Sequence, residues 1–423
     1  MNCRRLLVVP ALVVAALVAQ AGLAAPAQAA GVRYAAPTGS GTACTNAAPC
    51  SLATAVTNAA SGDEVVVAWG TYSMGTTVLL NPNANVNVHG AGAGAGRPVI
   101  NTSAITGLQL TGSGARVSDL TINQTGPGLS FGLNLFATGI SVQRVSVAST
   151  ATVACFLGYT GVARDSLCVT SAPNGIAVDD SWGDTALTNG PLTLRNITAV
   201  ATGTGSYGLR AAAGDFANID LDTRNVIASG TQADVRASRT ATSSDSDVVL
   251  QNSNYDLVSS SGSGVTITAA GTGTNQTAAP VYADAAFHQA LGSPTIDKGA
   301  TDAGVGTTDI DGGGRKVGTA TDIGADEFVP DTTAPDTAID HTPKHKTHKR
   351  KAVFTFHASE TATFTCVVDK KPPAPCSSPY KLKPKKRGRH TLTVIATDTV
   401  GNVDATPATF TWKLRKPKRH RHR

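Results

Sequence analysis

The chain has 423 residues, which suffices for about two or three domains and excludes a single small module. Charged residues make up 15% of the sequence, compared with about 25% in an average protein. The chain contains 43 glycines, and its 41% hydrophobic content excludes general disorder. Few charges, much glycine and an aliphatic core with only 5% aromatic residues favour an extracellular β-rich scaffold.

The N-terminus has the pattern of a secretory signal peptide. Arg4 and Arg5 precede an apolar run over residues 6–19, and Ala27-Gln28-Ala29 has the small-x-small pattern of a cleavage site. The run is shorter than the roughly 20 residues of a membrane-spanning helix. We therefore expect residues 1–29 to be removed on export, leaving a secreted, soluble monomer without a membrane span.

Six of the seven cysteines lie beyond this segment and form three close couples: Cys44 with Cys50, Cys155 with Cys168, and Cys366 with Cys376. In an exported protein, such couples predict three local disulfides. Metal ligation is the alternative, but no couple has Cys-x2-Cys spacing or accompanying histidines.

The first predicted elements are a short helix followed by a strand. Residues 51–60 place Leu52, Val56 and Ala59 at helical spacing. A Ser-Gly-Asp turn leads into a β-branched run at 64–68, which is bounded by Gly70. This pattern predicts a helix that caps the start of a β structure.

Short apolar alternations then recur at residues 117–122, 142–147, 194–199 and 216–221. Their centres, Leu120, Val145, Ile197 and Ile219, are 25, 52 and 22 residues apart, so the middle step spans two repeats. Stacked coils of this length bury a shared aliphatic core, which predicts a parallel β-helix. A β-sandwich is the rival, but few Asn-Gly or Asp-Gly hairpin turns are present.

Composition changes after Phe328. Residues 329–343 read as a proline-punctuated linker, and 344–414 contain four alternating strands, beginning at Ala352, Ala362, His390 and Ala408. Residues 415–423 are almost entirely basic and are expected to be disordered. From His341 onward there are 20 Lys and Arg against four acidic residues, so a basic C-terminal region follows an acidic-leaning body.

Particular motifs resemble known families. The opening Tyr34-Ala-Ala-Pro-Thr-Gly39, with the predicted helix and Gly70-Thr-Tyr72, resembles secreted bacterial right-handed parallel β-helix proteins of the pectin-lyase-like superfamily over residues 30–328. Ser293-Pro-Thr-Ile-Asp-Lys-Gly299, followed by Asp309-Ile-Asp-Gly-Gly-Gly-Arg315 and Asp322-Ile-Gly-Ala-Asp-Glu327, resembles the choice-of-anchor Q segment that closes many such helices.

The C-terminal region resembles the Ig-like repeats of actinobacterial surface proteins. The resemblance lies in Glu360-Thr-Ala-Thr-Phe-Thr-Cys366, Ala374-Pro-Cys376 and Ala396-Thr-Asp-Thr-Val-Gly-Asn402. It also implies a local disulfide between Cys366 and Cys376. The expected fold class is thus all-β: a right-handed single-stranded parallel β-helix followed by a small Ig-like β-sandwich.

The β-helix superfamily includes lyases, which need carboxylates to hold Ca²⁺ and a basic residue to remove a proton. Asp220, Asp222 and Arg224 share one strand parity, which predicts two ion ligands beside a base. Asp215 and Arg195 are expected nearby. The alternative is a solvated charged strand face, which is common in soluble solenoids.

Three other groups of residues resemble functional sites but are interpreted as structural features. Asp179-Asp180 resembles the acidic pair of polygalacturonases, but a turn with Asp184 is favoured because the family's other elements are absent. Asp309-Ile-Asp311 begins like a calcium loop, yet Ala320 stands where the EF-hand acid belongs, so a closing loop is favoured. The C-terminal histidines are interpreted as part of a solvated polybasic segment.

No cofactor motif is visible, and Ca²⁺ is required only by the lyase alternative. The sequence therefore predicts a secreted or cell-surface protein that binds polysaccharide or an anionic cell-wall polymer without catalysis. Nucleic acid is not an expected physiological partner. The alternative is a Ca²⁺-dependent lyase of acidic polysaccharide that uses Asp220, Asp222 and Arg224.

Overall fold

The computed structural model describes residues 30–92, 96–126, 128, 130–182, 190–214, 218–240, 244–271 and 273–416. The predicted signal peptide and residues 417–423 of the predicted tail lie outside these ranges. The chain divides between Phe328 and Val329 into two compact units, called here the β-helix unit and the sandwich unit. No helix in the described ranges is long and apolar enough to cross a membrane.

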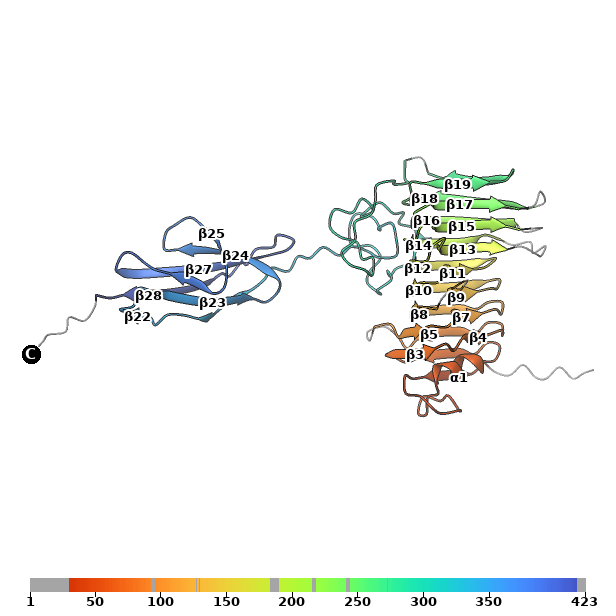
Figure 1. Ribbon diagram of the computed structural model, residues 1–423, viewed down its shortest axis with the longest axis horizontal. Helices are drawn as coiled ribbons and strands as arrows, with labels where there is room; N and C mark the ends of the chain where they lie inside the picture. Colours follow the sequence, from red (N-terminus) through yellow and green to blue (C-terminus); the bar gives the residue numbers. More distant parts are fainter. Residues whose placement is uncertain are drawn as a thin grey trace, which may run out of the picture. The chain divides into compact units, whose positions relative to one another are not determined.

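The β-helix unit is built from two parallel sheets to which the chain contributes strands in turn (Figure 1). Along its main path the first sheet contains β1 (Val32–Ala35), β2 (Glu64–Val67), β5 (Asn87–Gly90), β8 (Arg116–Gln124), β10 (Ile140–Ser149), β12 (Gly161–Thr170), β14 (Leu192–Ala201), β16 (Asn218–Gly230), β18 (Asp245–Gln251) and β20 (Val265–Ala269). In the same sheet, β6 (Val99–Thr102) pairs with both β8 and β3 (Thr71–Gly75).

The second sheet contains β4 (Leu79–Asn81), β7 (Thr106–Leu110), β9 (Phe131–Leu135), β11 (Val153–Leu157), β13 (Ile176–Trp182), β15 (Tyr207–Ala213), β17 (Ala233–Arg239) and β19 (Val258–Ser261). Inward Val, Ile, Leu and Ala side chains of both sheets form one continuous core. The Cys155–Cys168 disulfide joins β11 to β12 across this core. The predicted parallel β-helix is confirmed.

The predicted repeat alignment is correct for one pair and wrong for another. Leu120 pairs with Val145, as expected. Ile197, however, pairs with Val226, and Ile219 lies in register with Ser246. The error arises because β16 has 13 residues and carries two apolar alternations, one on each side of a bend. The sequence pattern alone does not tell which of them continues the ladder of β14.

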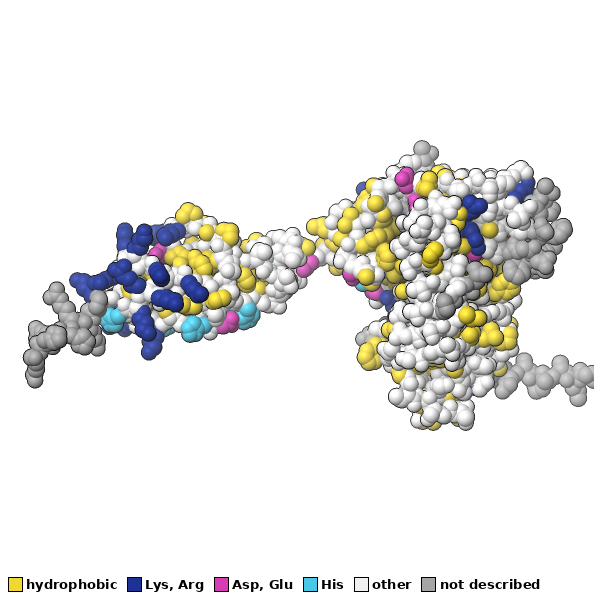
Figure 2. Space-filling model, viewed as in Figure 1, with side chains coloured by type: hydrophobic (Ala, Val, Ile, Leu, Met, Phe, Trp, Pro, Cys, Tyr) yellow, Lys and Arg dark blue, Asp and Glu magenta, His cyan; other side chains and the backbone are white. Residues whose placement is uncertain are grey.

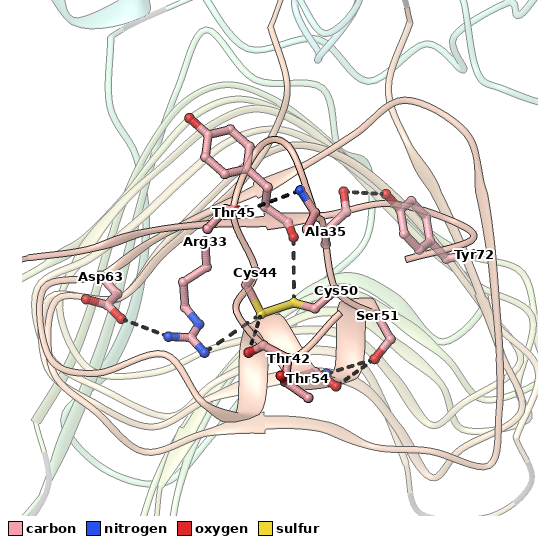
Figure 3. Close-up of a disulfide and its surroundings, with 12 residues drawn as sticks. Arg33, Ala35, Thr42, Cys44, Thr45, Cys50, Ser51, Thr54, Asp63 and Tyr72 are labelled. Atoms are coloured by element: carbon pink, nitrogen blue, oxygen red, sulfur yellow. Dashed lines mark hydrogen bonds and ion pairs between the residues drawn. A yellow bond between two sulfur atoms is a disulfide. The ribbon is translucent and has the colours of Figure 1, made fainter. Parts of the chain in front are cut away.

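The N-terminal end of the core is covered by α1 (Leu52–Thr57), which begins where the Ser51 hydroxyl accepts a hydrogen bond from the Thr54 N–H at 3.1 Å. The predicted helix is therefore confirmed, although it is shorter than expected. Beside it, the Cys44–Cys50 disulfide closes a small loop, and Arg33 extends between Asp63 and the Cys44 sulfur (Figure 3). These contacts close the first coil against solvent.

A ladder of left-handed residues bends the long strands of the first sheet. Six residues have φ between 47° and 57° at matching places in consecutive coils: Asp119, Arg144, Asp165, Asn196, Asn225 and Asn252. Asn and Asp tolerate this conformation better than other side chains with a Cβ. Asn225 Nδ2 donates to Asn196 Oδ1 at 3.0 Å, and Asn196 Nδ2 donates to Asp165 Oδ1 at 2.7 Å. These six residues are called the corner ladder.

Residues 279–328, called the closing segment, pack against the corner ladder. Their one helix is a short 3₁₀ turn, η1 (Ala303–Val305). Asn225 holds Ala300 through both backbone groups, accepting from its N–H at 2.7 Å and donating to its C=O at 3.0 Å. Asn196 donates to the Val305 carbonyl at 2.6 Å. The ladder amides thus hydrogen-bond backbone groups that have no sheet partner.

The interior of the closing segment is polar. Arg315 is 2% exposed and donates to the carbonyls of Asp322, Gly324 and Ala325. Burial raises the pKa of Asp326 to about 6 and that of Glu327 to about 7. A buried guanidinium surrounded by carbonyls explains how a segment with little regular structure keeps one conformation.

The sandwich unit consists of antiparallel strands in two layers, with a short parallel pair at one edge. One sheet contains β21 (Thr337–His341), β23 (Ala352–Ala358) and β26 (Tyr380–Leu382); the other contains β22 (Lys346–Thr347), β28 (Ala408–Leu414), β27 (Gly388–Asp398), β24 (Ala362–Val368) and β25 (Ala374–Cys376). Phe354, Phe356, Leu392 and Trp412 fill the core. The four predicted strands and the third predicted disulfide, between Cys366 and Cys376, are confirmed.

We predict that Asn225→Ala lowers the free energy of unfolding of the β-helix unit by about 2–4 kcal/mol, because it removes the bonds to Ala300 and puts a poorly tolerated residue in a left-handed position. Urea denaturation followed by circular dichroism measures this. Asn225→Gly retains the backbone freedom and is expected to lose less. Equal stability of wild type and Asn225→Ala would contradict the role of the ladder.

Candidate functional site

The predicted lyase residues lie together on the outer face of β16. Asp220, Asp222 and Arg224 alternate with buried residues, as their parity predicted. Asp222 accepts from Arg195 at 2.5 Å, while Arg224 pairs with Asp302 and donates to Gln251 Oε1 at 2.6 Å. Asp215 lies outside the described residues. Arg195 is therefore close to the set, as expected, but its guanidinium neutralises Asp222.

Asp220 has a different environment from Asp222. It is the register partner of Asp247 on β18. Burial raises the pKa of Asp220, and the charges of Asp247 and Asp245 raise it further. Neither Asp220 nor Asp222 belongs to a group of three close potential metal ligands among the described residues. With Asp222 and Arg224 held in ion pairs, these side chains do not fit a calcium site as they stand.

The predicted turn at Asp179 and Asp180 is wrong. Both residues lie within β13 and are buried, and Asp184 lies outside the described residues. Arg210 binds Asp179 through two hydrogen bonds of 2.8 and 2.6 Å. Asp180 Oδ2 is buried without a hydrogen-bond partner among the described residues. Burial, reinforced by the charge of Asp179, raises the pKa of Asp180 to about 8.

The β-helix unit contains a cavity of about 500 Å³ between its first sheet and the closing segment. Its walls come from parts of the chain that are far apart in sequence. The lining residues are Gly90, Gly92, Gly96, Arg97, Asp119, Thr121, Arg144, Thr308, Ile310, Asp311 and Gly312. This cavity is called the corner cavity, since Asp119 and Arg144 belong to the corner ladder.

Two ion pairs organise its polar lining. Arg144 Nε donates to Asp119 Oδ1 at 2.6 Å, and its Nη1 donates to the Thr308 hydroxyl at 3.1 Å. Arg97 donates to Asp311 Oδ1 at 3.2 Å and to the Ile310 carbonyl at 3.0 Å. Both arginines thus extend from the coils to the closing segment, and they fix the distance between the two walls.

The sequence alone does not predict this cavity. Its coil wall and its opposite wall are about two hundred positions apart, and Arg97 reaches Ile310 across a separation of 213 residues. One signal was present: the alternating glycines from Gly90 to Gly96 indicate close approach of the backbone to another group. A Cβ at Gly90 would lie 2.4 Å from the Asp119 carbonyl oxygen, so only glycine fits there.

Two groups of side chains within the described ranges bring three potential metal ligands together. In the first, His288, Asp311 and Asp326, the imidazole already binds two carboxylates, Asp311 at 2.9 Å and Asp284 at 2.6 Å. Burial alone would lower the pKa of His288, but these carboxylates raise it. The neighbouring protein charges therefore account for this group without a metal ion.

The second group contains Asp331, Glu360 and Asp398 of the sandwich unit. Asp398 Oδ1 accepts hydrogen bonds from three backbone N–H groups of residues 400–402. Asn402 then donates to the carbonyls of Asp331 and Thr333, which fixes the start of the unit against this loop. The position of Asp398 is thus explained by its role in the loop.

The sandwich unit is electrically polarised. Exposed Lys and Arg gather where β23 and β27 begin and where β26 and β28 end, and Figure 2 shows them on one end of this unit. They are Lys346, Lys349, Arg350, Lys351, Lys383, Lys385, Lys386, Arg387, Arg389, Lys413, Arg415 and Lys416, called the basic end. The nearby carboxylate of Asp369 already binds His390 at 3.0 Å. Asp331, Asp336, Glu360, Asp398 and Asp404 lie toward the opposite ends of the strands.

Comparisons with known proteins do not indicate an activity for this chain. No protein-family model matches the chain, and no curated protein sequence gives a significant match. Among solved structures it is similar to one described as the crystal structure of pectate lyase Pel9A, with TM-score 0.38 and 14% identity over 70% of this chain and 96% of that chain. It is also similar to ORF18 of Geobacillus virus E2, with TM-score 0.26 and 10% identity over 84% and 69% of the two chains. Likenesses of this size carry no argument about activity.

The raised pKa of Asp180 makes stability depend on pH. The folded state keeps a proton up to about pH 8 that the unfolded chain, with an ordinary pKa of 3.8, has already lost. The free energy of unfolding therefore falls as pH rises across this window. We predict that Asp180→Asn raises Tm by a few degrees at about pH 8 and has little effect at about pH 4.

The neighbouring carboxylate provides a matched control. Asp179→Asn breaks the two-bond ion pair with Arg210, so it is expected to lower Tm. Differential scanning calorimetry across the pH range measures both variants. A lower Tm for Asp180→Asn at about pH 8 would show that this carboxyl stabilises the fold instead.

Proposed function

We propose that the protein is secreted and binds a polysaccharide or an anionic cell-wall polymer, without catalysis. The basic end of the sandwich unit is the observation that carries this proposal. Its Lys and Arg side chains are exposed, and the acidic residues of the unit lie mostly at the other ends of the strands. Three disulfides support an oxidising, extracellular location, where wall polymers are the abundant polyanions.

A concentrated positive surface attracts a linear polyanion through many weak contacts. Each exposed lysine contributes little alone, because solvent and salt screen its charge. Twelve cations at one end together produce a field that raises the local concentration of a polyanion. Phe354 and Trp412 are buried in the core of this unit, so they do not face a ligand, which agrees with binding through charge.

Charge-reversal variants in the loop between β26 and β27 test the proposal. We predict that the triple variant Lys383→Glu, Lys385→Glu, Lys386→Glu weakens binding to polygalacturonate and to poly(glycerol phosphate) by about tenfold or more at low salt, and flattens the dependence of affinity on salt concentration. Fluorescence polarisation with labelled polymer measures both quantities.

A control variant with the same charge change lies in the β-helix unit. Arg116→Glu, Lys298→Glu, Lys316→Glu replaces three exposed cations. It should retain most of the polymer affinity. If both triple variants bind equally, the basic end is not the binding surface and net charge alone explains the attraction.

The lyase alternative has one supporting observation. Asp220 and Asp247 are adjacent carboxylates on the outer face of the coils, and a bound cation would relieve their repulsion. Arg224 would have to leave Asp302 and Gln251 before it could act on a substrate. We therefore favour binding without catalysis.

Incubation with polygalacturonate and Ca²⁺ separates the two proposals. We predict no increase in the absorbance of unsaturated products over the buffer control. Product that requires Ca²⁺ and disappears in Arg224→Ala would instead support a lyase that uses Arg224 with Asp220 and Asp222. Asp302→Ala frees Arg224 from its ion pair and should not create activity if the protein only binds.

A further inference from the structure

We propose that the corner cavity of the β-helix unit binds a neutral, hydroxyl-rich saccharide, with one sugar ring stacked on Trp69. This inference deepens the proposed polysaccharide-binding function, because it names a site and a ligand class for the β-helix unit. The proposal stands on three features of the described residues: an exposed indole, a set of charges that are already balanced, and walls made of glycine.

Trp69 is the exposed aromatic beside the cavity. It lies in the turn between β2 and β3 with 63% of its surface exposed, whereas Trp412 is 2% exposed. A Cβ at Gly96, a cavity-lining residue, would lie 3.2 Å from Trp69 Nε1, so the indole abuts this wall. The flat face of the indole matches the C–H face of a sugar ring, and its N–H supplies a donor at the edge.

The charges of the cavity favour a ligand without net charge. The two guanidinium groups, Arg97 and Arg144, are matched by the carboxylates of Asp311 and Asp119. An anionic sugar would place a further negative charge beside Asp311 and Asp119, and the repulsion between these like charges would weaken its binding. A neutral sugar avoids this cost.

Each ion pair retains hydrogen-bonding capacity for hydroxyl groups. Arg144 uses Nε and Nη1 for Asp119 and Thr308, and Arg97 uses its two terminal nitrogens for Ile310 and Asp311. A guanidinium has five N–H donors and a carboxylate about four acceptor positions, so both groups can still bind further partners. A vicinal diol both donates and accepts, and therefore suits a paired guanidinium and carboxylate.

The glycine walls leave room for a ring. The cavity volume of about 500 Å³ falls within the range of roughly 300–1,000 Å³ that is usual for ligand sites. Gly92 and Gly312 have positive φ and present backbone without side chains. Few apolar side chains line the cavity, so the main apolar contact is with Trp69 at its edge. This composition suits a sugar better than a lipid or an aromatic ligand.

Isothermal titration calorimetry of the full chain with cellopentaose, xylopentaose and mannopentaose, and with trigalacturonate for comparison, tests the inference. We expect at least one neutral pentasaccharide to bind with an affinity that changes little with salt. Trp69→Ala should weaken that binding about tenfold or more. Thr121→Tyr, which fills the cavity from an outward position on β8, should abolish it.

Ile105→Ala is the matched control for Trp69→Ala, because Ile105 is 62% exposed, about as much as Trp69, but it neither lines the cavity nor abuts Gly96. It should bind like the wild type. Failure of all three neutral pentasaccharides to bind, binding of trigalacturonate alone, or unchanged affinity in both cavity variants would overturn the inference. The anionic-polymer surface is judged separately, since its lysines belong to the sandwich unit and its binding is expected to be weakened by salt.

Discussion

The left-handed bend shared by consecutive coils is the constraint on which the β-helix unit depends. Each long strand of the first sheet must turn at one residue, and that residue must accept positive φ. Asn and Asp satisfy this requirement and also carry side chains that can hydrogen-bond to a neighbouring coil, as Asn225 does to Asn196 on the preceding coil. One backbone conformation thereby creates a row of polar groups along the corner, of which Asp165, Asn196 and Asn225 are buried.

Those polar groups determine where the closing segment lies. Asn196 and Asn225 offer amide groups that the segment's backbone matches at Val305 and Ala300. At two earlier coils the ladder positions are occupied by Asp119 and Arg144, which form an ion pair. The long side chain of Arg144 also donates to the Thr308 hydroxyl, and this contact leaves space between the coils and the closing segment. The corner cavity is thus a consequence of the residue type at each ladder position, because short amides hold the segment close and an arginine holds it farther away.

Much of the fold was predictable because it depends on local pattern. Alternating aliphatic residues indicate strands, close cysteine couples indicate disulfides, and the charge imbalance after His341 indicates a basic region. The position of Asp180 was not predictable, since a carboxyl in a strand interior violates the usual burial pattern. The pairing of Arg97 with Asp311 was also hidden, because it requires the path of the closing segment, which has almost no regular structure to predict.

Hydrogen–deuterium exchange of the closing-segment amides tests most directly whether the corner ladder holds this segment in place. The N–H groups of Ala300, Gly324 and Ala325 donate to Asn225 Oδ1, the Asn225 carbonyl and the Thr198 hydroxyl at 2.7, 3.0 and 2.9 Å. We expect these amides to exchange as slowly as those of β14 and β16, since they open only with the β-helix itself. If these amides instead exchange at the rate of an unprotected loop, the corner ladder does not hold the closing segment in place. The corner cavity would then lack a fixed second wall.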